Sequence, residues 1–272
     1  MKSLVLTLKH EPYQRLDLSP LVPHLLGAKT VKEIAGIELQ TTREKLTAGD
    51  IFKIKAGNVA SIRIEGSQRL DHIGREMKAG EIIVEGDCGK ALGRGMSGGN
   101  IVAYGDCGPH AGSAMAGGRL EIAGDCGDFL GAPFEGEMEG MTGGFLIVRG
   151  SAGERAGDRL RRGTIVIEGF AGDYPGSRMI AGTLIVLGGG GSLPGYLMRR
   201  GTIVLAEAPK LAPTFIDCGA HELAFAGLFA NLLRPESRAA ARLLSRPLMR
   251  FAGDMATLGK GEIFFPGTLG SR

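Results

Sequence analysis

Short apolar runs recur along the middle of the chain at a fixed interval. Each run holds five residues of strand pattern between two glycines, as in Thr164–Glu168 between Gly163 and Gly169. The stretches between runs are too short and too rich in glycine for a helix. The pattern therefore predicts short β-strands joined by tight corners.

Aligned on these runs, the chain divides into repeating segments. They begin at Lys78, Ser97, Ala116, Thr142, Arg161, Ile180 and Arg199, so that all steps but the third have the same length. One strand with its corners per 19-residue segment is typical of a β-solenoid, whose turns pair about 4.8 Å apart along the axis. We therefore predict an all-β solenoid of 19-residue turns. Residues 61–77 and 49–57 resemble weaker copies, and the third segment is predicted to end at Phe134.

Strand alternation predicts which side chains face the interior. The fifth and seventh positions are apolar in every copy, as at Ile165 and Ile167, so both should lie inside. The sixth position faces outward, yet six of its seven residues are aliphatic: Ile83, Val102, Ile147, Val166, Ile185 and Val204. A sheet that is apolar on both faces is covered on both. Either the chain's own termini cover these six residues, or they form an interface with a partner subunit.

The two ends of the chain differ from the repeats. Residues 1–48 hold no repeat and are predicted to form an N-terminal cap, followed by the repeat domain over 49–210. The remainder, 211–272, is expected to be a helical extension. Its pattern predicts one helix over His221–Leu233, with Asp217 ahead of it, and a second that Pro235 opens and that ends at Leu244.

Glycine dominates the composition, with 46 of 272 residues, or about 17% against a usual share near 7%. The glycines do not recur every third residue, so collagen is excluded. A hydrophobic share of 43% and a net charge of +3 exclude a disordered chain. The excess falls at the third, ninth, twelfth and sixteenth positions of each segment, where a solenoid needs tight corners.

The four cysteines accompany no secretory signal, which favours the reducing cytoplasm over a disulfide scaffold. No apolar run is long enough to span a membrane. Cys88, Cys107 and Cys126 occupy the same position in three successive segments and should stack as buried thiols. With no fourth Cys or His at ligand spacing, they predict no metal site. The preceding aspartates, Asp87, Asp106 and Asp125, are expected to cap turn amides.

Catalytic motifs are missing from this pattern. The five histidines are scattered, and none belongs to a nucleophilic or paired-histidine motif. The GxGxxG match at 93–98 lacks the βαβ context of a dinucleotide site. We therefore expect no catalytic residue. Basic and acidic residues are interleaved, which argues against nucleic acid as a partner.

Two pairs of arginines are weaker candidates for a binding site. Arg161 and Arg162 begin one segment, and Arg199 and Arg200 begin the segment two turns later. They form either a solvated edge that nearby carboxylates neutralise or a site for an anionic ligand or subunit.

The repeated G-x-x-G-x-x-x-G, as at 105–112, resembles the right-handed β-helix domain of glutamate synthase. The whole chain is more similar to the C subunit of formylmethanofuran dehydrogenase. This similarity extends beyond the repeats into Pro213–Phe215, Cys218–Gly219, His221–Leu223 and 253–263. The resemblance implies a right-handed parallel β-helix that carries no catalytic residue and acts as a scaffold.

Two complexes use such a subunit. In archaea it belongs to a tungsten or molybdenum enzyme that reduces carbon dioxide to formylmethanofuran. In methylotrophic bacteria it belongs to a formyltransferase/hydrolase complex, which moves formyl from tetrahydromethanopterin to a methanofuran analogue and hydrolyses it to formate. Usage rich in Arg, Ala and Gly favours the bacterial complex, with amidohydrolase-like hydrolase and formyltransferase subunits as partners. A glutamate synthase fragment and the archaeal scaffold remain as alternative assignments of the chain. A hexapeptide acyltransferase is disfavoured, because its turns do not match the 19-residue repeat.

The resemblance also gives the arginines a candidate ligand. Arg161, Arg162, Arg199 and Arg200 would hold the poly-glutamate tail expected on a methanofuran-type carrier. No other cofactor is expected on this chain.

Overall fold

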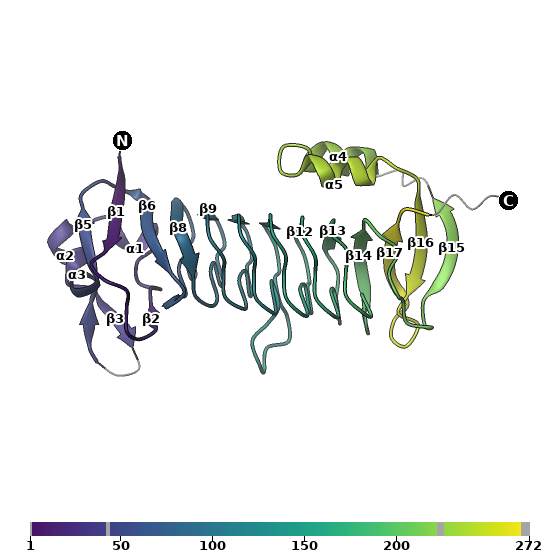
Figure 1. Ribbon diagram of the computed structural model, residues 1–272, viewed down its shortest axis with the longest axis horizontal. Coiled ribbons are helices and arrows are strands. Elements are labelled where there is room, and N and C mark those ends of the chain that lie inside the picture. The colour runs from purple at the N-terminus through teal and green to yellow at the C-terminus, as the bar shows by residue number, and fades with distance from the viewer. Residues whose placement is uncertain (1, 42–43, 222–225, 268–272) are drawn as a thin grey trace.

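The computed structural model describes residues 2–41, 44–221 and 226–267. Thirteen strands form one long sheet in the order β15-β16-β17-β14-β13-β12-β11-β10-β9-β8-β6-β1-β5 (Figure 1). These strands are β1 (Ser3–Leu8), β5 (Phe52–Lys55), β6 (Asn58–Ser67), β8 (Glu81–Cys88), β9 (Asn100–Ala103), β10 (Arg119–Ile122), β11 (Phe145–Val148), β12 (Thr164–Ile167), β13 (Thr183–Val186), β14 (Arg200–Leu205), β15 (Ile216–His221), β16 (Leu248–Gly253) and β17 (Lys260–Phe265). The sheet is parallel from β1 through β14 to β17, and antiparallel where β5, β15 and β16 join.

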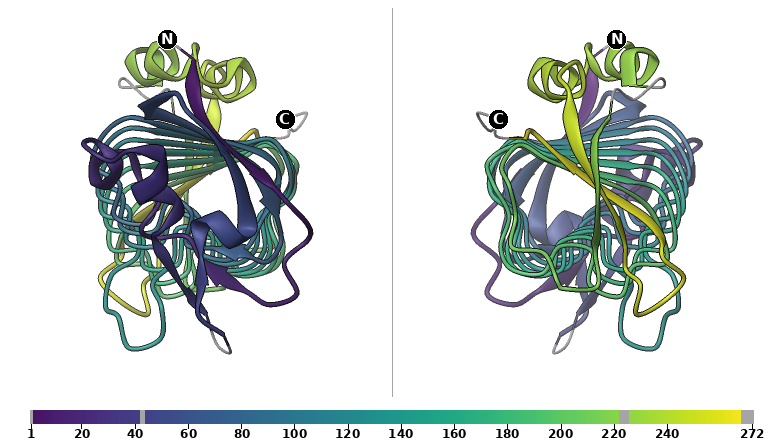
Figure 2. Two further views of the ribbon diagram at one scale, coloured as in Figure 1. Left: turned by 90° about the vertical axis from the view of Figure 1, so that its left-hand side faces the viewer. Right: turned by 90° about the vertical axis from the view of Figure 1, so that its right-hand side faces the viewer.

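The register of the parallel strands follows the sequence repeat. Ile165 of β12 pairs with Leu184 of β13 and with Leu146 of β11, the equivalent residues of the next and the preceding segment. A second ladder of single bridges joins Cys88, Cys107, Cys126, Ala152, Ala171 and Gly190 in the same order. Viewed along the long axis, the stacked turns lie one behind another around a shared interior (Figure 2). The predicted alignment of the segments is confirmed.

The interior is built by the residues that the alternation predicts. The fifth and seventh positions of all seven segments are buried, as at Ile165 and Ile167. Methionines fill a further row at the end of most turns, namely Met96, Met115, Met141, Met179 and Met198. Met141, and not the expected Phe134, closes the third turn, because its N–H bonds to the Gly131 carbonyl as that of Met115 bonds to Gly112.

The N-terminal part of the chain closes one end of the sheet (Figure 1). It holds α1 (Pro23–Leu26), α2 (Val31–Ala35), α3 (Ala48–Ile51) and a small sheet of β4 (Leu46–Thr47), β3 (Glu38–Thr41), β2 (Leu16–Asp17) and β7 (Leu70–Asp71). The expected weak repeat at 49–57 is wrong: it forms the end of α3 and then β5, which runs antiparallel to β1. Residues before 49 also supply β1, the parallel neighbour of β6.

The C-terminal part holds two helices, α4 (Ala226–Leu233) and α5 (Arg238–Leu244), and the strands β15, β16 and β17. The helix predicted to start at His221 is wrong at its beginning, because Ile216–His221 is a strand that pairs with β16. Residues 222–225 of that prediction lie outside the described residues. The second helix begins after Ser237, whose hydroxyl accepts the Ala240 N–H, and not at Pro235.

The two helices lie across the outer face of β11 to β14 (Figure 1). They bury the outward aliphatic residues Ile147, Val166, Ile185 and Val204 against a second core that includes Ala230, Leu233 and Leu244. The chain itself therefore covers four of the six residues considered for a partner interface. Ile83 and Val102, on β8 and β9, are only half-buried.

Candidate ligand groove

A loop interrupts the repeat between β10 and β11. Arg119 of β10 pairs with Phe145 of β11, and this step in sequence is longer than the 19-residue step to the strands on either side. Because Met141 closes the turn, the seven additional residues are 134–140, which we call the inserted loop. It projects from the side of the molecule opposite to the helices (Figure 1).

The inserted loop folds back onto the neighbouring turn through aromatic contacts. Phe134 meets the ring of His110 edge to face at 4.7 Å between centroids. His110 also stacks in parallel on Phe129, one turn away, at 4.9 Å. Burial lowers the pKa of His110, and its Nδ1 is buried without a hydrogen-bond partner in the described part of the chain. The histidine is therefore neutral near pH 7 and serves as one layer of an aromatic stack.

An arginine fixes the loop from the other side. The Arg94 guanidinium lies 3.9 Å from the centre of the Phe134 ring, and its Nη2 donates to Glu137 Oε1 at 2.5 Å. The Phe134 N–H donates to the second carboxylate oxygen of Glu137 at 2.9 Å. Arginine, ring and carboxylate thus hold one another, which gives the loop a defined shape.

Between the inserted loop and the next two turns lies a cavity of 380 Å³. Its walls include His110, Phe129, Glu137, Arg159 and Arg178. Arg178 Nε donates at 2.8 Å to the buried carboxylate of Asp158, which also accepts from the Ser177 hydroxyl at 2.6 Å. The cavity thus has one aromatic wall and one cationic wall.

A second cavity of 280 Å³ continues along the same side and shares Met138, Arg159 and Arg178 with the first. Arg161 and Arg199, two of the predicted arginines, line it. Arg161 also forms an ion pair with Glu139 of the inserted loop. We call the two cavities together the arginine groove.

The other two predicted arginines lie outside it. Arg162 and Arg200 are exposed but do not line either cavity, although they are adjacent in sequence to residues that do. His110, Phe129 and Glu137 line the groove but were not among the site residues predicted from the sequence. The longer third step was the available signal, since an insertion in a solenoid forms a loop on one face.

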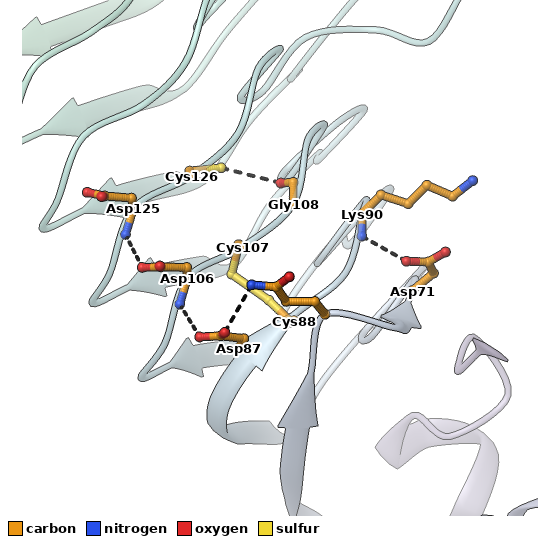
Figure 3. Close-up of a disulfide and its surroundings, with 10 residues drawn as sticks. Asp71, Asp87, Cys88, Lys90, Asp106, Cys107, Gly108, Asp125 and Cys126 are labelled. Carbon is orange, nitrogen blue, oxygen red and sulfur yellow. Dashed lines mark hydrogen bonds between the residues drawn. A yellow bond between two sulfur atoms is a disulfide. The ribbon is translucent and has the colours of Figure 1, made fainter. Parts of the chain in front are cut away.

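Asp87, Asp106 and Asp125 lie in line on successive turns (Figure 3). Asp87 Oδ1 accepts the Asp106 N–H at 2.9 Å, and Asp106 Oδ1 accepts the Asp125 N–H at 2.8 Å. Each carboxylate thus caps an amide of the next turn, and the predicted capping is confirmed. In the described residues, no group of three or more His, Cys, Asp or Glu side chains could hold a metal ion.

The cysteine ladder differs from the expected row of free thiols. Cys88 and Cys107 form a disulfide between neighbouring turns (Figure 3). Their Cα atoms are 4.8 Å apart, which the stacking distance of the turns dictates and which a disulfide accommodates. Cys126 stays a buried thiol that hydrogen-bonds to the Gly108 carbonyl. Burial raises the pKa of Cys126 to about 12, so it is a poor nucleophile.

Comparison with known proteins places these features in context. No family model matches the chain. It is 53% identical over 262 residues to the C subunit of the formyltransferase/hydrolase complex Fhc of Methylorubrum extorquens, and the match covers 96% of this chain and 98% of that protein. The crystal structure of the formyltransferase/hydrolase complex (FhcABCD) from Methylorubrum extorquens in complex with methylofuran contains a similar chain. The TM-score is 0.94 at 42% identity, over 97% of this chain and 100% of that one.

Archaeal relatives match a shorter part. The C subunit of tungsten-containing formylmethanofuran dehydrogenase 2 from Methanothermobacter marburgensis is 34% identical over 93 residues, which are 32% of this chain and 34% of that protein. The equivalent from Methanococcus maripaludis is 30% identical over 92 residues, 33% of this chain and 34% of that protein. Among the described residues, no helix has the length and apolar character needed to cross a membrane.

Proposed function

The chain belongs to the family of C subunits of formyltransferase/hydrolase and formylmethanofuran dehydrogenase complexes, and on this premise we propose that it is the structural, non-catalytic subunit of a formyltransferase/hydrolase complex. The proposed complex moves formyl from tetrahydromethanopterin to a methanofuran analogue and hydrolyses the formyl carrier to formate. The observation that carries this proposal is similarity over 96% of the chain to the bacterial protein, against about a third for the archaeal ones.

A scaffold role is supported by the structural contacts of the side chains that could otherwise take part in catalysis. The candidates for acid–base or nucleophilic chemistry are engaged structurally: His110 lies in an aromatic stack, and Asp158 pairs with Arg178. Cys126 is buried and protonated. We further infer that the stacked turns form a right-handed parallel β-helix, since the 19-residue register and the second ladder of bridges repeat from turn to turn. The cytoplasmic location stays a prediction from the sequence.

Companion subunits test the proposal. When this chain is tagged and co-expressed with hydrolase and transferase subunits of a formyltransferase/hydrolase complex, the purified complex should contain all of them. It should release formate from the formylated carrier. The isolated chain should have no such activity. A chain that stays monomeric beside folded companion subunits, or an active complex that contains tungsten or molybdenum, would contradict this assignment.

For the arginine groove we propose that Arg161 and Arg199, together with Arg159 and Arg178, hold the anionic tail of a methanofuran-type carrier. Four guanidinium groups line the two cavities. Arg161 and Arg178 pair with Glu139 and Asp158, whereas Arg159 and Arg199 form no ion pair with a carboxylate of the described residues. Carboxylates are the ligands that guanidinium groups recognise best. Arg162 and Arg200 are left out of this site because neither lines the groove.

A paired substitution separates these two sets. Arg161→Glu with Arg199→Glu should lower the carrier retained by the purified complex at least tenfold, as measured by mass spectrometry. The same charge reversal at Arg162 and Arg200 serves as the control and should leave retention within twofold. Equal retention in both variants would remove the groove as the carrier site while leaving the scaffold role intact.

A further inference from the structure

The hairpin of α4 and α5 has a groove on the side facing away from the sheet. The groove has a volume of 690 Å³, and its walls are Asn231, Arg234, Pro235, Arg238, Ala241, Arg242 and Ser245. The residues that pack on the sheet, such as Ala230, Leu233 and Leu244, belong to the other side of the same helices. The groove is therefore an outer surface of the chain and is separate from the arginine groove.

Its three arginines have no acidic partner among the described residues. Arg234, Arg238 and Arg242 are exposed, and none forms an ion pair with a carboxylate in that part of the chain. The arginines beneath the hairpin behave differently. Arg119 pairs with Glu121 and Glu236, and Arg149 pairs with Glu121 and Glu168. Carboxylates neutralise the buried side of the hairpin, whereas its outer side keeps its positive charge.

The positions of these arginines are unfavourable for an isolated helix. Arg238 and Arg242 lie four residues apart on α5, where like charges repel. Arg238 is also the first residue of α5, the end of a helix that disfavours a cation, and no acidic residue stands in that first turn. An external anion would relieve both effects at once.

The groove is lined mainly by polar and charged side chains. The exposed leucines of α4, Leu228 and Leu232, line a separate pocket between α4 and strands β13 and β14. Three arginines side by side match several carboxylates of a protein segment better than one small ion, and arginine is enriched at protein interfaces.

From this charge pattern we propose that the α4–α5 groove docks an acidic segment of a companion subunit. Two or more carboxylates of that segment pair with Arg234, Arg238 and Arg242. This inference rests on the proposed function, because it requires a hetero-oligomeric complex. It adds to that function the face of the chain and the chemistry of the partner.

The test uses the co-expressed complex, with the tag on this chain. One variant carries Arg234→Gln, Arg238→Gln and Arg242→Gln, and the matched control carries Arg162→Gln, Arg200→Gln and Arg246→Gln. Both remove three exposed charges, but the control residues lie outside the groove. The groove variant should raise the dissociation constant of one companion subunit at least tenfold at about 0.1 M salt. It should also flatten the salt dependence of that constant, whereas the control should change neither.

Each other outcome has a distinct meaning. If the unaltered chain retains no companion subunit, the proposed function itself fails. If the complex forms and the groove variant keeps wild-type affinity, or loses no more than the control, the docking inference is wrong. If the groove variant keeps every companion subunit but loses co-purified material that nuclease digests, the groove binds a nucleic acid and the docking inference is wrong.

Hydrogen exchange tests the same inference without any substitution, in case the groove variant fails to fold. Backbone amides of 231–245 in the unaltered chain should exchange more slowly in the complex than in the free chain. Unchanged exchange would contradict the docking site.

Discussion

Glu236, in the loop between α4 and α5, accepts a hydrogen bond from Arg119 Nε of β10 at 2.9 Å, across 117 residues of sequence. The Glu236 carbonyl also accepts from Arg149 Nη1, directly after β11, at 2.8 Å. Next to it, the Ser237 hydroxyl donates to Glu168, directly after β12, at 2.6 Å. Polar contacts to three successive turns thus fix the tip of the hairpin, while apolar packing holds the rest.

Removing the charge of Glu236 tests this anchor. Glu236→Gln keeps the size of the side chain but weakens its bond to Arg119, so we expect a loss of about 1 kcal/mol in the free energy of unfolding. Amides of 226–244 should exchange faster with solvent, because the hairpin opens more often than the sheet. Glu38→Gln, at an exposed position of β3, is the control. Unchanged exchange in the hairpin would show that packing alone holds it.

Substitution by alanine should change the free energy of unfolding in opposite directions at two glycines. Gly163 has a φ of +95°, and an added Cβ would lie 2.8 Å from the Gly144 carbonyl oxygen of the preceding turn. Gly163→Ala should therefore destabilise the chain by about 2 kcal/mol. Apart from the backbone of α4 itself, no atom of the described residues lies within 4 Å of a Cβ added to Gly227, so Gly227→Ala should stabilise by about 0.5–1 kcal/mol. Chemical denaturation measures both. A destabilised Gly227 variant together with a neutral Gly163 variant would contradict the proposed reason for the glycine repeat.

The repeat could be predicted from the sequence because the interior imposes it. A turn has room inside only for aliphatic side chains such as Ile165 and Ile167, and the stacked turn leaves no space for a Cβ at Gly163. Both constraints return in every segment, so alignment alone reveals the register.

Features that depend on contacts between residues far apart in the sequence, outside the repeat, could not be predicted in this way. The helix predicted from His221 onward gave no sign of a strand before it, yet Ile216–His221 pairs with β16 and is a strand. The aromatic stack is a second such feature: Phe129 and His110 are one turn apart, but only the path of the inserted loop brings Phe134 onto His110. The longer third step indicated that a loop exists without indicating the direction in which it folds.

The disulfide between Cys88 and Cys107 should contribute to stability. It closes a loop over a sequence separation of 19, for which the loss of unfolded-state entropy is worth about 3 kcal/mol. Reductant should therefore lower the melting temperature of the wild type. The Cys88→Ala and Cys107→Ala double variant should melt at the same temperature with and without reductant. Cys126→Ala, the control, should stay sensitive to reductant. A wild type that is indifferent to reductant would show that the two thiols are not joined.

Acid should loosen the inserted loop through His110. Burial lowers the pKa of His110 in the folded chain, whereas in the unfolded chain it returns to about 6.5. The unfolded state therefore binds more protons as the pH falls below about 6.5. The stability that the neutral ring contributes is present above that pH and is lost as the pH approaches the lowered pKa. The pKa of His72 is lowered for the same reason, and this adds to the slope.

His110→Phe isolates the contribution of this ring. Phenylalanine fits the backbone, since Phe129 adopts the same positive φ of 62° one turn later, and it preserves the stack. The free energy of unfolding should then fall less between pH 7.5 and 5.5 than in the wild type. The slope that remains is due to His72 and the carboxylates. If the His110 variant keeps the wild-type slope, the ring is not the group that titrates, and the loop does not respond to acid through it.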